Sequence, residues 1–133
     1  MKKVLIIDDA RWVRDNFERA GEVMEIEIET PSSIKDIEER LRNIPYAAIL
    51  LDHDLEDQSF DLRVDPSVFC NPSNLNGKQL HDGIRAGRYG KINRQTPIYS
   101  ISDSFRDYGL SLTCKGGDAL EYVKALEQVV ATP

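Results

Sequence analysis

Acidic residues follow two apolar segments of this chain, and their positions indicate a metal site. The apolar segment 4–7 runs straight into Asp8 and Asp9, and the apolar segment 47–51 ends at Asp52. In an open α/β sheet, ligands bind beyond the carboxyl ends of the parallel strands. Carboxylates crowded together there repel one another unless a cation such as Mg²⁺ (or Mn²⁺) lies among them. The sequence therefore predicts an acidic pocket that holds a divalent ion.

Two later apolar segments end in groups that suit a phosphate. Ser102 follows the segment 98–101, and Lys115 follows the segment 110–114. A serine hydroxyl donates a hydrogen bond to a phosphoryl oxygen, and a lysine places a positive charge on another. The Asp52 carboxylate could act as a nucleophile towards phosphorus and form an acyl phosphate. The combined pattern indicates a pocket for a phosphoryl group and a metal ion.

Strands and helices alternate along the chain. Apolar patterning predicts strands over 3–8, 24–29, 47–52, 98–101 and 110–114, and helices over 11–23, 33–44, 76–87 and from 118 onward. Such alternation implies right-handed crossovers and a parallel sheet with helices on both faces. Residues 57–75 form a long irregular insertion that carries many apolar side chains, so we expect an ordered flap over the acidic pocket. We also expect Trp12 to cap the core beside that pocket.

The bulk properties describe one α/β domain over residues 1–133. The formal net charge of −6 argues against nonspecific nucleic-acid binding, and no basic amphipathic segment points to a membrane surface. The apolar segment at the N-terminus is too short for a signal peptide or a spanning helix. Cys70 and Cys114 fit no metal-binding spacing and suggest no disulfide framework, so the cytoplasm is the expected compartment.

The four segment ends together resemble the receiver domain of two-component response regulators, across nearly the whole chain. The matching positions are Val-Leu-Ile-Ile-Asp8-Asp9, Ile-Leu-Leu-Asp52, Pro97-Ile-Tyr-Ser-Ile-Ser102 and Thr-Cys-Lys115. The resemblance implies a CheY-like, doubly wound sheet of five parallel strands in the order 2-1-3-4-5. It also implies a partner that donates phosphate, namely a sensor histidine kinase or a phosphotransfer protein, and a downstream protein target.

Carried over position by position, the resemblance assigns roles to individual residues. Asp9 and Asp52 would be metal ligands with Asp8 assisting, and the backbone carbonyl of Asp54 would complete the metal shell. Asp52 would be the phosphoacceptor. Ser102 and Lys115 would sense the bound phosphate.

The chain departs from the family pattern between the last two motifs. Ser102 and Lys115 are so close in sequence that only about one helical turn fits where the fourth helix belongs. Asp103 also stands where the family has a small residue. The leading hypothesis is a stand-alone, divergent phosphoacceptor. One alternative is a receiver-like enzyme that processes cyclic phosphates or phosphomonoesters, because Asp52 and Asp54 look like a nucleophile and acid pair. Another is a pseudo-receiver that only binds proteins.

Overall fold

The computed structural model describes residues 2–59, 67–101, 107–112 and 118–131. The strands are β1 (Lys3–Ile7), β2 (Glu27–Glu29), β3 (Ala48–Leu51), β4 (Ile98–Ser100) and β5 (Leu110–Ser111). They form one parallel sheet in the order β2-β1-β3-β4-β5. The helices are α1 (Arg11–Met24), α2 (Ile34–Asn43), α3 (Gly77–Arg85) and α4 (Ala119–Ala131). The predicted α/β fold and strand order are confirmed.

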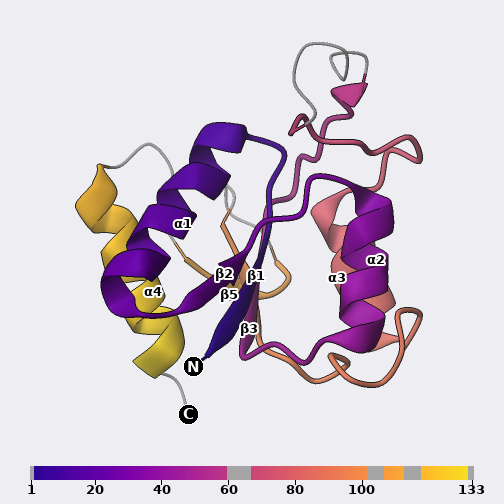
Figure 1. The fold of residues 1–133 in the computed structure, drawn as a ribbon. Coiled ribbons are helices and arrows are strands. Elements are labelled where there is room, and N and C mark those ends of the chain that lie inside the picture. The colour runs from indigo at the N-terminus through magenta and orange to yellow at the C-terminus, as the bar shows by residue number, and fades with distance from the viewer. Residues whose placement is uncertain (1, 60–66, 102–106, 113–117, 132–133) are drawn as a thin grey trace.

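Strands β1 and β3 are buried on both faces of the sheet, as the side chains of β1 illustrate. Val4 and Ile6 point into an apolar cluster with α1 and α4, whereas Leu5 and Ile7 point into a second cluster with α2 and α3. All four side chains are fully buried. A strand covered on both faces needs apolar residues at every position, which explains the continuous apolar runs in the sequence. Figure 1 shows α1 and α4 on one side of the sheet and α2 and α3 on the other.

The α1/α4 face differs in detail from the sequence-based expectation. Val13, Phe17 and Ala20 of α1 are buried, but Trp12 is 53% exposed, so the prediction that it caps the core is wrong. The rings of Phe17 and of Tyr122 on α4 form a T-shaped pair, with ring centroids 4.9 Å apart. Periodicity locates the apolar stripe of a helix but does not decide which residue at its border turns outward.

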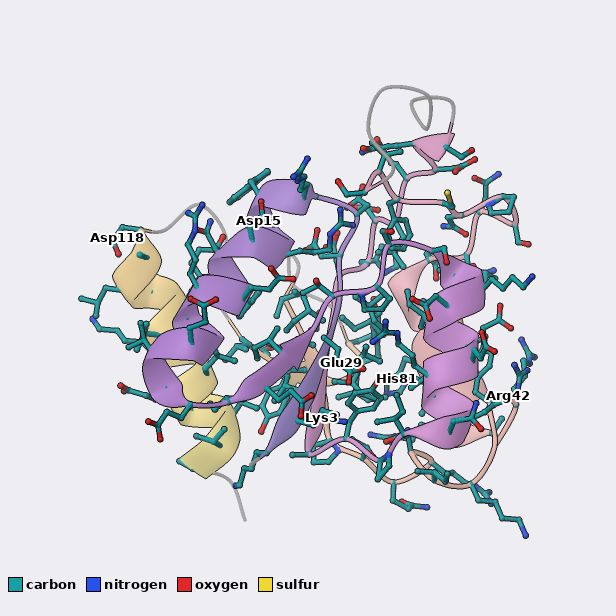
Figure 2. All side chains as sticks on the ribbon, viewed as in Figure 1. Lys3, Asp15, Glu29, Arg42, His81 and Asp118 are labelled. Atoms are coloured by element: carbon teal, nitrogen blue, oxygen red, sulfur yellow. The ribbon has the colours of Figure 1, made fainter. Side chains whose placement is uncertain are left out.

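The edge strand β2 is fixed to the sheet by a polar network at Glu29. Its carboxylate accepts hydrogen bonds from Arg40 of α2 at 2.7 Å and from the Tyr46 hydroxyl at 2.5 Å, and Lys3 of β1 lies 3.5 Å away. Figure 2 shows Lys3 and Glu29 beside one another. Burial would raise the pKa of Glu29, but the hydrogen bonds from Tyr46 and Arg40 outweigh burial and lower it. Ser33 begins α2 as expected, because its side chain accepts the Asp36 N–H at 3.1 Å.

The connection from β4 to β5 carries no helix among its described residues, 101 and 107–109. Residues 102–106 lie outside the described part of the chain. Tyr108 belongs to this connection, and its side chain is buried in the apolar cluster of α2 and α3. Gly109 follows with a φ of +71°, a left-handed conformation that glycine adopts without strain. These findings agree with the expectation that the helix between the fourth and fifth strands is reduced.

Part of the insertion 57–75 is packed against the domain, at residues 69–71. Phe69 is fully buried in the α2/α3 cluster, and the backbone at Cys70 forms a parallel bridge with Ser33. The fully buried Asn71 side chain donates to the carbonyls of Leu55 and Leu75, at 2.6 and 2.8 Å. Residues 60–66 lie outside the described part of the chain, so the flap over the acidic pocket stays a prediction. In the part described, no helix is long and apolar enough to cross a membrane.

Candidate metal site

Three carboxylates meet where β1 and β3 end. One oxygen from each of Asp8, Asp9 and Asp52 lies within 4.8 Å of the others. The backbone fixes this meeting, because Ile7 pairs with Leu51 and the Asp52 N–H continues the ladder to the Ile7 carbonyl at 2.9 Å. The strand order reverses between β1 and β3, and ligands of open α/β sheets bind in the crevice at such a point. The structure thus brings together the three acids that the sequence singled out.

The burial of these acids favours a bound cation. Asp8 is fully buried and Asp52 is 5% exposed, while Asp9 is only partly buried. The Oδ1 atom of Asp8 accepts the Ala10 N–H at 2.8 Å, and the Oδ2 atom of Asp9 accepts the Glu56 N–H at 3.2 Å. Grouping ionised carboxylates away from water is costly unless an opposite charge accompanies them. An all-oxygen donor set of this kind fits Mg²⁺, which binds through one or two carboxylates and retains several waters.

A buried arginine that sequence reasoning missed stands beside the acids. Arg14 of α1 is 3% exposed, and its Nη1 atom donates to the Asp8 backbone carbonyl at 3.1 Å. Burial lowers the pKa of this guanidinium, and the charges of Asp8, Asp15 and Asp9 oppose that shift. Three carboxylates and one guanidinium carry a net charge of −2 when ionised, which one divalent cation neutralises. Arg14 lies on the same helical face as Val13 and Phe17, so its spacing was a signal for burial, although charged residues are usually exposed.

Behind Asp52, the chain packs closely around His53. The Nδ1 atom of His53 lies 2.7 Å from the Tyr108 hydroxyl, and the Gly77 N–H donates to the His53 carbonyl at 2.8 Å. A Cβ atom at Gly77 would lie 2.6 Å from the Tyr108 hydroxyl and closer still to the Asp52 carbonyl. Only glycine therefore allows the first turn of α3 to approach the end of β3 this closely. The ring of His81, on α3, lies 5.3 Å from the Tyr108 ring.

The structure does not test the roles of the other predicted site residues. Ser102, Asp103 and Lys115 lie outside the described residues, so their positions relative to Asp52 stay predictions. The strand that leads to Ser102 is in register with β3, since the Ile101 N–H donates to the Leu51 carbonyl at 3.1 Å. Strand β5, which leads toward Lys115, pairs in parallel with β4. The role of the Asp54 carbonyl as a metal ligand likewise stays a prediction.

Comparison with known proteins identifies the fold. No protein-family model and no curated protein sequence matches the chain. Among solved structures, the HemR receiver domain from Leptospira biflexa has a TM-score of 0.71 at 15% identity, covering 100% of this chain and 97% of that one. The chain has the receiver-domain fold. The chemotaxis protein CheY4 of Vibrio cholerae has a TM-score of 0.69 at 16% identity, covering 97% of this chain and 98% of its own.

A third receiver domain has a metal in its cleft. The receiver domain of sensor histidine kinase PA1611 from Pseudomonas aeruginosa carries a coordinated magnesium ion in its active-site cleft. It matches with a TM-score of 0.68 at 16% identity, over 98% of both chains. With identities this low, the likeness establishes the receiver fold, and function has to be argued from the residues of the site.

Proposed function

We propose that this receiver domain accepts a phosphoryl group on Asp52 in a Mg²⁺-dependent reaction, as part of two-component signalling. The observation that carries the proposal is the meeting of Asp8, Asp9 and Asp52 within 4.8 Å at the β1/β3 crevice. The backbone hydrogen bond from the Asp52 N–H to the Ile7 carbonyl holds Asp52 there. The crevice is where ligands bind in open α/β sheets.

Each residue of the pocket has a chemical task in this proposal. An Asp52 oxygen attacks phosphorus, so that an O–P bond forms while the bond from phosphorus to the donor breaks and the donor leaves with the electron pair. Asp8, Asp9 and Asp52 would hold Mg²⁺, which neutralises phosphoryl oxygens when bound. Ser102 would donate a hydrogen bond to one phosphoryl oxygen and Lys115 would place a positive charge on another.

The donor and target of the reaction are proteins in this proposal. A sensor histidine kinase or a phosphotransfer protein would supply the phosphoryl group in the cytoplasm, and a downstream protein would respond to the phosphorylated state. The described residues between β4 and β5 form no helix. In this proposal the response therefore uses a surface other than a helix at that position.

A binding experiment tests the proposal. Beryllofluoride with Mg²⁺ imitates an acyl phosphate and should raise the melting temperature of the wild-type protein, but not that of Asp52→Asn. Asp107→Asn, a change at an exposed acid, should respond like the wild type. Failure of the wild type to respond to Mg²⁺ or to beryllofluoride would favour a pseudo-receiver. Metal-dependent turnover of a cyclic phosphodiester or phosphomonoester, lost in Asp54→Asn, would favour the enzyme.

A further inference from the structure

Arg14 joins the acidic pocket to the insertion. One arm of its guanidinium donates from Nη1 to the carbonyl of Asp8 at 3.1 Å, and the other donates from Nη2 to the carbonyl of Ser67 at 2.6 Å. Ser67 is 53 residues away in sequence, in the insertion that follows β3. A nearly fully buried arginine is thus held between the end of β1 and the returning half of the insertion.

A second contact joins the insertion to the same pocket. The Glu56 N–H, where the insertion begins, donates to the Asp9 carboxylate at 3.2 Å. The residue just before the insertion therefore contacts the Asp9 side chain, and the returning half of the insertion contacts the β1 end through Arg14. The two halves also bind each other, because the Gln58 N–H donates to the Phe69 carbonyl at 2.7 Å.

The returning half of the insertion continues from Ser67 to α2. The Cys70 N–H donates to the Ser32 carbonyl at 2.8 Å, and the Ile34 N–H donates to the Cys70 carbonyl at 2.9 Å. These bonds lead from Arg14 to the first turn of α2 within a few residues.

We propose that Arg14 is a positioning residue that fixes the Asp8–Asp9 turn and the insertion relative to each other. Its action on the cation depends on the proposed function, whereas its action on the insertion does not. The planar guanidinium group of Arg14 can bind the two carbonyls at once, because its N–H groups point in fixed directions. A lysine at this position would keep the charge but could not hold the same two carbonyls with a planar fork.

Charge and geometry predict opposite effects on metal affinity, which makes the proposal testable. Removal of a nearby positive charge alone would strengthen Mg²⁺ binding to the three acids. Loss of a positioning group would weaken it, by about tenfold for the outer partners of metal ligands. Arg14→Met removes the charge and the fork, whereas Arg14→Lys removes only the fork. The matched control is Arg19→Met, an exposed arginine on the same helix.

Two measurements decide the outcome. The first is hydrogen exchange of the metal-free proteins, in which the Gln58, Cys70 and Asn71 amides should exchange at least about tenfold faster in both Arg14 variants than in Arg19→Met. The second is Mg²⁺ titration followed by Trp12 fluorescence, in which Arg14→Lys should bind about tenfold more weakly than wild type. Arg14→Met should be weakened less than Arg14→Lys, because loss of the positive charge offsets part of the effect. If Arg14→Met does not fold, Arg14→Lys decides both.

Opposite results overturn the proposal. Arg14→Lys with wild-type exchange and wild-type Mg²⁺ affinity would show that the fork has no positioning role. Tighter Mg²⁺ binding by Arg14→Met with unchanged exchange would make Arg14 only a counter-charge. If the wild type binds no Mg²⁺, the proposed function fails, and the exchange rates of the metal-free variants still decide whether Arg14 positions the insertion.

Discussion

Asp52→Asn should make the metal-free protein more stable, although it removes the proposed acceptor. One oxygen of each acid lies within 4.8 Å of the others, and two unit charges at that distance repel by about 3.5 kcal/mol at an effective dielectric constant of about 20. Asparagine has nearly the same shape as aspartate and removes two of the three repelling pairs. The gain will be smaller than the full repulsion, because Arg14 and the predicted neighbour Lys115 offset part of the negative charge. We expect a rise of about 2 kcal/mol in the free energy of unfolding.

The assay is urea unfolding followed by circular dichroism, with and without a chelator. In chelator, Asp52→Asn should be more stable than wild type, while Asp107→Asn should lie within about 0.5 kcal/mol of it. Saturating Mg²⁺ at about 100 times the dissociation constant should stabilise the wild type by about 2.7 kcal/mol and the variant by much less. An Asp52→Asn protein that is less stable than wild type in chelator would refute the argument from carboxylate repulsion.

Three further changes test how the site is supported. Gly77→Ala should lower the free energy of unfolding by about 1–3 kcal/mol in thermal melts, because its methyl group would collide with the backbone at the end of β3; unchanged stability would show that α3 moves away freely. Asn71→Ala should cost about 2–4 kcal/mol in urea unfolding, since the buried carbonyl of Leu55 and the partly buried carbonyl of Leu75 lose their donor; a cost below about 0.5 kcal/mol would contradict that role. Glu29→Gln should destabilise the protein at neutral pH. Because folding lowers the pKa of Glu29, the stabilisation from its carboxylate is present above about pH 4.5 and fades as the pH falls further. The stabilities of the two proteins should therefore converge in acid. A difference that does not depend on pH would rule out the carboxylate as its source.

Much of this site could be predicted because it lies at the ends of buried strands. The apolar runs before Asp8 and Asp52 are continuous, so they identify two-sided strands, and parallel strands place their carboxyl ends along one edge. The side-chain cap of Ser33 on the Asp36 amide was also readable, because capping is local in sequence.

The unpredicted features depend on contacts between distant and irregular segments. Arg14 is buried through the carbonyl of Ser67, in an insertion that has no periodic pattern to reveal where it returns. Tyr108 is a similar case, since it meets His53 from 55 residues away in sequence. Trp12 was misplaced because periodicity does not tell a border position of a helix from a core position.

The most direct test of the central claim is phosphorylation of the purified protein by a small phosphodonor such as acetyl phosphate. Intact mass and peptide mapping after chemical reduction of the acyl phosphate would locate the modification. With Mg²⁺, the account predicts one phosphoryl group per chain, on Asp52, absent in chelator and in Asp52→Asn. Modification of another residue, or equal modification in Asp52→Asn, would contradict it.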